Sequence, residues 1–372
     1  MAIVLGVALG GVMPEWCIRI FLTFNGLFSQ LLGFLIPLII VGMVIPAIAD
    51  IGRGAGRMLL YTVLLAYAST IVAGLAAYFT GALTFPSLID AGTSLDAATD
   101  VAKLTPYFTV EIAPLMSVMT ALVLAFMVGL GLAYLKGDAL RKVAVDFGDL
   151  VTMTIEAVII PLLPLYIFGI FLDMTAAGEV MRVIGVFIKI IGVIFVLHIV
   201  WLVLLYMVSG TVSKRNPFKM LSTMLPAYFT ALGTQSSAAT IPVTLAQTRK
   251  MGVSDEVSGF VVPLCATIHM SGSMLKIVAC AMALMLMQGI AFDFGMFFGF
   301  ICMLAITMVA AAGVPGGAIM AALGVLATML GFTAEDQALM ISLYIAMDSF
   351  GTACNVTGDG ALAAIMDRIN KK

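Results

Sequence analysis

Long apolar runs separated by short polar stretches dominate the first 209 residues. Each of the last five runs is long enough to cross a bilayer, which takes about 20 apolar residues in a helix. The pattern therefore predicts six membrane-spanning helices in 1–209, the first of them short. The runs begin at Ala2, Gly26, Leu59, Ala113, Leu150 and Val183.

In the second part of the chain, small and polar residues interrupt the apolar stretches. Two segments, 218–248 and 294–331, each hold two apolar arms around a polar or glycine-rich tip. Each arm is too short to span, and irregular backbone at membrane depth is tolerated only where protein or a water-filled cavity satisfies it. We expect two re-entrant hairpins, each followed by a span, at 256–289 and 335–369.

The composition agrees with an integral membrane protein. Of 372 residues, 62% are hydrophobic and 10% are charged, and the mean hydropathy is +1.17, whereas soluble domains carry about 25% charged residues. The predicted fold is all-α, with eight transmembrane helices and two re-entrant helical hairpins. The chain has no basic tract, so a nucleic-acid partner is not expected. Its five cysteines are scattered and form no CxxC pair, which predicts neither a disulfide framework nor a zinc site.

The positive charges indicate an orientation. With the N-terminus in the cytoplasm and alternating spans, 13 of the 18 lysine and arginine residues fall in cytoplasmic loops, as is typical of membrane proteins. We therefore expect a multi-pass protein of the inner (plasma) membrane with both termini cytoplasmic. The 13 are Arg53, Arg57, Lys136, Arg141, Lys142, Lys214, Arg215, Lys219, Arg249, Lys250, Arg368, Lys371 and Lys372.

The last predicted span carries a polar stripe. Asn355 and Asp359 follow Asp348 by seven and eleven residues, which places all three within about 20° of one line on a helix. Thr352 lies about 40° away from that line. Charged side chains in a membrane interior are costly and usually functional, so the stripe predicts an ion or substrate site in preference to a structural contact between helices.

The two hairpin tips are candidate anion sites. The first, Thr234–Thr240, offers hydroxyl groups and the free N–H groups at the start of a helical arm, which favour anions. The second, Ala311–Gly317, has Pro315 pre-set for a turn and glycines that let the backbone approach a ligand.

The order of four motifs resembles the dicarboxylate/amino acid:cation symporters, the glutamate transporter homologues. The motifs are SSAATIPVT, PLCATIHMSGS, AAGVPGG and NVTGD, in that order along the second half of the chain. The resemblance implies a homotrimer in the lipid bilayer and an elevator mechanism. Residues 1–209 would be mainly scaffold, with spans 3 and 6 moving with the transport core in 210–372.

The resemblance also implies roles for single residues. Asp348 would hold a substrate amino group, Ser236 and Ser237 a substrate carboxylate, and Asn355 with Asp359 a sodium ion. Val314, Pro315 and Gly316 would form an external gate. The full set of candidate substrate residues is Ser236, Ser237, Thr240, Val314, Pro315, Gly316, Asp348, Gly351, Thr352 and Asn355.

Two departures from the family pattern change the expected chemistry. Members with acidic substrates have an arginine where this chain has Gly351, so we expect a neutral substrate. A sodium-binding asparagine and aspartate of the family become His269 and Ser271, which puts at least one sodium site in question. Lys276, a basic residue in the same apolar segment, lies seven residues after His269.

Several roles remain open for the two basic residues. His269 is either a neutral, hydrogen-bonded histidine or a titrating or ligand-binding group. Lys276 either pairs structurally with Asp359 or Asp348, or replaces a missing sodium ion, fixed or releasing its proton. His269, Ser271 and Lys276 are therefore candidates for coupling and charge compensation.

The sequence predicts a secondary symporter of a small amino acid, neutral rather than acidic, coupled to Na⁺ and/or H⁺ and without another cofactor. One alternative is a carrier of a non-amino organic acid, in which Asp348 pairs with Lys276. A second is a proton-coupled carrier that uses Lys276 or His269, and a third is a channel. An enzyme is not expected, because neither a Gly-x-Ser-x-Gly elbow nor an HExxH helix occurs.

Overall fold

A computed structural model describes residues 2–53, 57–89, 104–178, 180–308 and 316–371. Within these ranges the regular structure is entirely helical, as predicted, and no strand occurs. The first half contains α1 (Ala2–Gly10), α2 (Glu15–Arg53), α3 (Arg57–Leu88), α4 (Val118–Tyr134), α5 (Ala139–Thr154), the π-helical turn η2 (Ile155–Ile159), α6 (Ile160–Ala176) and α7 (Val180–Ser213).

The second half contains eight helices in the described ranges. Its helices are α8 (Pro217–Thr234), α9 (Ser237–Lys250), α10 (Asp255–Ile268), α11 (Ser271–Met287), α12 (Phe294–Met308), α13 (Gly317–Leu330), α14 (Ala334–Ala346) and α15 (Asp348–Asn370). The helices α8 and α9 pack against each other, as do α12 and α13. These two pairs are the arms of the expected hairpins.

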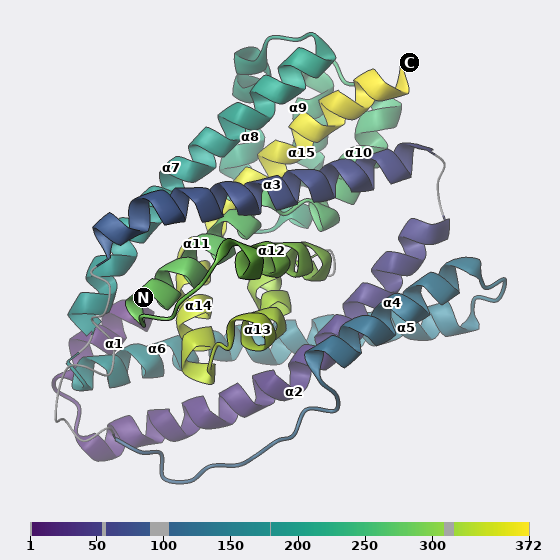
Figure 1. The fold of residues 1–372 in the computed structure, drawn as a ribbon. Helices are drawn as coiled ribbons and strands as arrows, with labels where there is room; N and C mark the ends of the chain where they lie inside the picture. The colour runs from purple at the N-terminus through teal and green to yellow at the C-terminus, as the bar shows by residue number, and fades with distance from the viewer. Residues whose placement is uncertain (1, 54–56, 90–103, 179, 309–315, 372) are drawn as a thin grey trace.

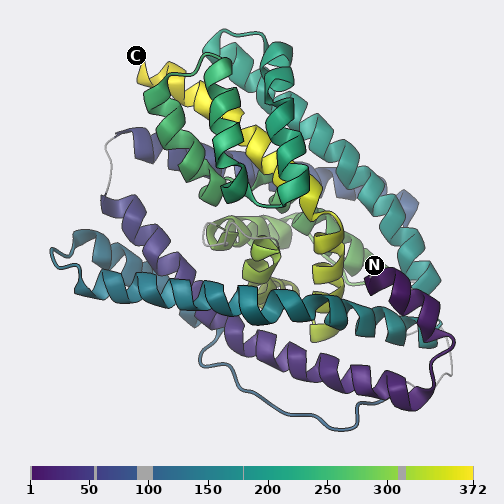
Figure 2. The same cartoon turned by 180° about the vertical axis from the view of Figure 1, so that it is seen from behind.

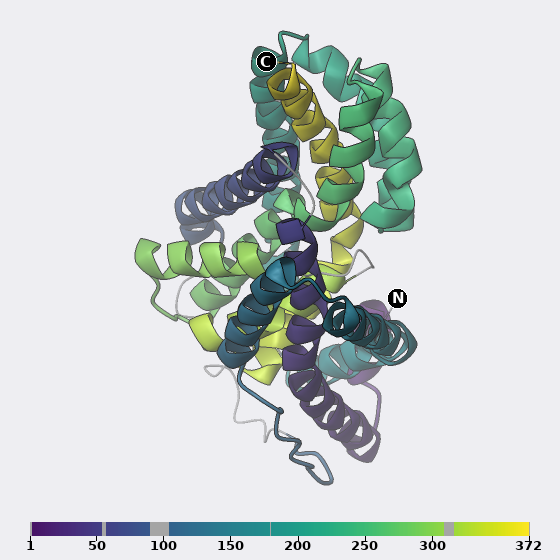
Figure 3. The same cartoon turned by 90° about the vertical axis from the view of Figure 1, so that its right-hand side faces the viewer.

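The helices form two groups with a third set between them. Figure 1 shows α7 to α10 with α15 in the upper group and α2 with α4 to α6 in the lower group. The views in Figure 2 and Figure 3 show the same division, with α11 to α14 between the groups and the C-terminus at the outer end of the upper one. The central helix of the upper group is α15, which contacts α7, α8, α9, α10 and α11.

The buried core runs along α11 and α15. Every residue from Ser271 to Met285 and from Gly351 to Asp367 is buried. Small residues permit this close packing, which is the usual basis of helix association in membranes. A Cβ added at Gly272, for example, would lie 2.6 Å from the Cβ of Cys354 and from the carbonyl oxygen of Gly351. The polar residues of the two helices are therefore enclosed by protein.

The two predicted spans of the second half are both interrupted, which corrects the continuous span expected at 335–369. The first is broken at His269 and Met270, between α10 and α11. The second bends by 63° between α14 and α15, at Met347. Asp348 is therefore the first residue of α15 and lies at a helix N-terminus rather than in mid-helix.

Length and hydropathy identify five helical stretches in the described residues that can cross a membrane, or six if the bent pair is one span. Two expected spans are shorter, since α1 has nine residues and α4 has 17. The total of eight spans stays a prediction. The five stretches are Glu15–Pro46, Arg57–Leu88, Ala139–Ala176, Val183–Ser213 and Asp255–Met287.

Candidate functional site

The two helix breaks bring the polar residues of the second half together. His269 and Met270 have extended or irregular backbone between α10 and α11. The N–H groups in the first turn of a helix have no partner within that helix. At the start of α11, Asn355 of α15 acts as the partner of two such groups. Its Oδ1 accepts from the N–H of Gly272 at 2.8 Å and from the N–H of Ser273 at 3.3 Å. A residue of one broken span thus caps the other.

Both polar atoms of the Asn355 side chain contact groups of α11. Its Nδ2 donates to Ser273 Oγ at 3.1 Å, and Ser273 Oγ lies 2.9 Å from the hydroxyl of Tyr344. All three side chains are buried. The network joins α11, α14 and α15, so it holds the two broken spans at one relative position.

Lys276 is fully buried and pairs with Asp348. Its Nζ lies 3.1 Å from Asp348 Oδ1 and 3.5 Å from the centre of the Tyr344 ring. The carbonyl oxygen of Met347 lies 3.4 Å from the same nitrogen. The carboxylate and the face of the aromatic ring both stabilise the positive charge of the buried ammonium group. Of the two acidic partners weighed from the sequence, the geometry places Lys276 on Asp348.

The other carboxylate oxygen of Asp348 holds the second hairpin. Its Oδ2 accepts the N–H of Gly316 at 2.8 Å. Gly316 has φ of +76°, a conformation that favours glycine. Both oxygens of Asp348 therefore have donors from the protein itself, one from α11 and one from the start of α13.

Gly351 provides the space for Lys276. A Cβ added at Gly351 would lie 2.5 Å from Nζ of Lys276 and 3.1 Å from its Cδ. The lysine side chain thus crosses α15 over the one position in this turn that has no side chain. Gly351 and the buried Lys276 are therefore parts of a single packing arrangement.

Asp359 pairs with the histidine instead. Its Oδ1 lies 2.9 Å from His269 Nδ1, and the Nε2 atom of the same ring lies 3.0 Å from Ser69 Oγ of α3. Because a carboxylate only accepts, Nδ1 carries the hydrogen of the first bond. His269 and Asp359 are each 1% exposed. The three residues form a buried row from α3 through the break to α15.

The first hairpin tip reaches the start of α15. Gln235 has a left-handed backbone, and its Nε2 donates to Ser349 Oγ at 2.9 Å. Ser236 caps α9 by accepting from the N–H of Ala239 at 3.2 Å, and Thr240 donates to the carbonyl oxygen of Ser236 at 2.8 Å. The N-terminus of α9 therefore lies beside the residue that follows Asp348.

The structure brings together most of the residues predicted from the sequence. One connected set contains Asp348, Gly351, Lys276 and Gly316, and it reaches Asn355 through Tyr344 and Ser273. His269 and Asp359 form a second set with Ser69. Thr352 is buried nearby in α15, while Ser271 and Ser237 are buried at the starts of their helices. Val314 and Pro315 lie outside the described residues, so their gate role stays a prediction.

Four residues of the network, Ser273 among them, were not predicted as site residues from the sequence. Ser69 and Tyr344 lie in spans whose apolar pattern hides them, and His198 Nε2 lies 2.9 Å from the carbonyl oxygen of Gly272. The signal for His198 was available, because it is one of two histidines in the chain and lies within an apolar span. No comparable signal marks Ser69 or Tyr344.

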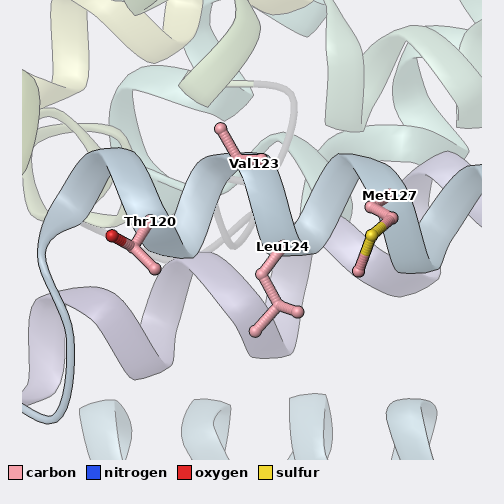
Figure 4. Close-up of a pocket in the computed structure, with 4 residues that line it drawn as sticks. All are labelled: Thr120, Val123, Leu124 and Met127. Atoms are coloured by element: carbon pink, nitrogen blue, oxygen red, sulfur yellow. The ribbon is translucent and has the colours of Figure 1, made fainter.

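A separate surface hollow of about 440 Å³ lies on α4, far from this network in the sequence and in the fold. Figure 4 shows the four residues that line it, Thr120, Val123, Leu124 and Met127, on one helix. They bring no ionisable group. The buried network, rather than this hollow, is therefore the candidate site.

Comparison with known proteins confirms the resemblance drawn from the motifs. The sodium:dicarboxylate symporter family matches residues 1–369. Excitatory amino acid transporter 2 of Homo sapiens is 33% identical over 173 residues, which are 46% of this chain and 29% of the relative. Excitatory amino acid transporter 1 of Bos taurus is 30% identical over 239 residues, 63% of this chain and 44% of the relative.

The chain spans less than half of the length of these relatives. The family match nevertheless extends over almost every residue of the chain, and the family is one of transporters, not of enzymes. The chain belongs to the sodium:dicarboxylate symporter family.

Proposed function

We propose that this chain is a secondary active carrier, and that its solute is a small organic acid without an amino group. Family membership supports the carrier activity. The proposed solute site lies at the start of α15, beside Gln235 of the first tip and Gly316 at the start of α13. The sequence left two solutes open, an organic acid without an amino group and a neutral amino acid. One contact favours the organic acid.

That contact is the ion pair between Lys276 and Asp348. The resemblance implies that this aspartate holds a substrate ammonium group, but here an ammonium group of the protein lies 3.1 Å from it. The other oxygen already accepts from Gly316. A solute with its own ammonium group would have to displace Lys276 into a buried, apolar environment, which is costly.

The solute carboxylate has two helix N-termini available. The first is that of α9, next to Ser349, and the second is that of α13, which begins one residue after Gly316. Helix N-termini bind anions through unpaired N–H groups and the helix dipole. Ser236, Ser237 and Gly316 thus retain the carboxylate-binding role predicted for the tips.

A neutral amino acid is the second candidate. The presence of Asp348 and the names of the relatives, excitatory amino acid transporters, favour a solute with an amino group, and Gly351 favours a neutral one. In that case Lys276 leaves Asp348 when the solute binds. The two candidates therefore differ in the position of one lysine side chain, and substrate selectivity separates them.

The test uses pairs of acids that differ only in the amino group. Succinate with aspartate, glutarate with glutamate, and propionate with alanine are added to the purified protein, and the unfolding temperature is recorded. Acids that stabilise the protein are then tested for uptake against a gradient in proteoliposomes. We expect the members without an amino group to raise the unfolding temperature and to be accumulated.

The control variant is Lys276→Met, which frees Asp348 for a substrate ammonium group. It should lose the preference for the deaminated acid and gain response to the amino acid of the same pair. Stabilisation of the unmodified protein by amino acids alone would contradict the proposal. Uptake that never exceeds the outside concentration would indicate a channel instead of an active carrier.

The remaining predictions about the assembly are part of the same proposal. We propose that 1–209 is mainly scaffold and that 210–372 moves in an elevator mechanism. The packing of α3 against α11 and α12, and of α7 against α15, supports assigning these two helices to the mobile part. A homotrimer in the plasma membrane, with both termini cytoplasmic, completes the proposal.

A further inference from the structure

We infer that this chain does not take up sodium at Asn355 and Asp359, because its own donors occupy the amide oxygen of Asn355 and one carboxylate oxygen of Asp359. The family implies sodium, and the resemblance assigns the ion to these two residues. Sodium is a hard cation that requires several oxygen ligands with free lone pairs. The described residues do not meet that requirement at this position.

The amide oxygen of Asn355 has no free lone pair. A carbonyl oxygen has two, and those of Asn355 are directed to the N–H groups of Gly272 and Ser273. Binding an ion at this oxygen would uncap α11 and leave two buried N–H groups without partners. Such groups are costly in an interior that water does not reach.

Asp359 faces an N–H donor rather than an oxygen. The hydrogen on Nδ1 of His269 points at Oδ1 of Asp359, and the ring is fixed from its far side by Ser69. A cation at this carboxylate oxygen would meet the positive end of that N–H bond. The imidazole ring therefore occupies one side of Oδ1 and blocks the approach of an ion from that side.

The charges around the network agree with the contacts. Asp348 and Asp359 are buried within α15, and each has a basic side chain within 3.1 Å, Lys276 and His269 respectively. Ser271, where the family pattern has an aspartate, contributes only a neutral hydroxyl group, which is buried without a hydrogen-bond partner in the described chain. Each buried carboxylate of this network thus has a donor of the protein at one of its oxygen atoms.

The basic groups are built into the helices at the break and cannot dissociate as an ion does. The Asn355 amide oxygen and one oxygen of Asp359 are therefore already engaged by donors of the protein itself.

The test measures ion binding rather than transport, so it is independent of the proposed substrate. The unfolding temperature of the purified full chain is followed in sodium chloride and in choline chloride at equal ionic strength. We expect the two curves to coincide. The double variant His269→Asn/Ser271→Asp restores the oxygen ligands of the family pattern, and we expect it to show a saturable rise with sodium only.

Two further measurements keep the inference falsifiable if the double variant does not fold. Radioactive sodium binding to the unmodified protein should stay at the level of a protein-free control. A saturable, sodium-specific effect in the unmodified protein that disappears in Asp359→Asn would overturn the inference. A sodium effect that persists in Asp359→Asn places the ion elsewhere and supports it. Failure of every organic acid to bind would refute the proposed function and leave this result unchanged.

Discussion

At the scale of single residues, Lys276 and Gly351 form one structural unit. The lysine side chain lies where any larger residue at 351 would have its Cβ, and its ammonium group contacts Asp348. In the sequence, Gly351 and Lys276 are 75 positions apart and gave no sign of a contact. Their contact explains why a buried lysine is tolerated: the space and the counter-charge both lie within one turn of α15.

The first prediction concerns the space beside this lysine. Gly351→Ala should destabilise the protein, because a methyl group would overlap the Lys276 side chain, and overpacking of this kind costs about 1–3 kcal/mol. The unfolding temperature in detergent measures the effect. Gly192→Ala is the matched control, since a Cβ there meets no atom within 4 Å. Equal stability of the two variants would show that Lys276 does not cross Gly351.

The second prediction concerns the ion pair. Lys276→Met leaves Asp348 as a buried carboxylate without its cation, and removal of one member of a buried pair costs about 3–5 kcal/mol. The double variant Lys276→Met/Asp348→Asn should recover most of that loss, because asparagine is neutral and can still accept from Gly316. Equilibrium unfolding of the four proteins gives the coupling energy. A coupling energy near zero would contradict the pairing.

At the scale of elements, the breaks in the two spans determine where the polar groups meet. A continuous helix satisfies its own backbone, whereas a break exposes donors that another element must satisfy. Asn355 performs this function for α11, and Asp348 performs it for the start of α13. The predicted stripe on the last span is therefore a set of contacts to the ends of other helices.

A similar arrangement closes the opposite end of α15. Asp367 accepts from Arg215 at 2.9 Å, from the N–H of Ser254 at 3.2 Å and from Lys371 at 2.8 Å. The three donors come from the α7–α8 connection, the start of α10 and the chain end. This carboxylate thus ties the end of α15 to both neighbouring connections.

The third prediction follows from these contacts. Asp367→Asn should lower the free energy of unfolding by about 1–3 kcal/mol, since it weakens hydrogen bonds of a buried side chain to charged groups. Lys371→Gln is the comparison, because Lys371 is half-exposed and its pair with Asp367 is of the weak surface type, within about 0.5 kcal/mol. Chemical unfolding of both variants measures the two losses in free energy of unfolding. A larger loss in Lys371→Gln than in Asp367→Asn would refute the prediction.

At the scale of the whole molecule, a cavity of about 200 Å³ lies between the two proposed parts. Ser29 of α2 and Tyr166 of α6 line it on the side of the scaffold, and Leu323 of α13 and Gln337 of α14 line it on the other side. An elevator motion of 210–372 would change this boundary. The cavity therefore identifies positions at which relative motion can be blocked.

The fourth prediction is that joining the two sides stops transport. Ser29→Cys with Gln337→Cys, in a background without the half-buried Cys17 and Cys302, should lose uptake when a short thiol cross-linker is added, and a reductant should restore it. Ser29→Cys with Tyr166→Cys joins two helices of the scaffold, whose side chains are 2.8 Å apart, and should leave uptake intact. Full uptake with the first pair cross-linked would argue against the elevator.

Much of the architecture was predictable because it follows from local chemistry. Apolar length identifies the spans, and the small or polar tips at 234–240 and 311–317 interrupt the arms of the hairpins. The bend at Met347 was not predictable, since nothing in that stretch breaks a helix by itself. It depends on Asp348 meeting both Lys276 and Gly316, which are distant in the sequence.

The sequence by itself determined the membrane environment, the helical class and the family, because hydrophobic length and motif order do not depend on the path of the chain. It also identified which residues are chemically unusual. Only the tertiary structure decided their partners: Lys276 on Asp348, His269 on Asp359 and Ser69, and Asn355 on the start of α11. The physical reason is that a buried charge is compensated by whatever group the packing brings within a few ångströms, and that choice is not written in sequence spacing.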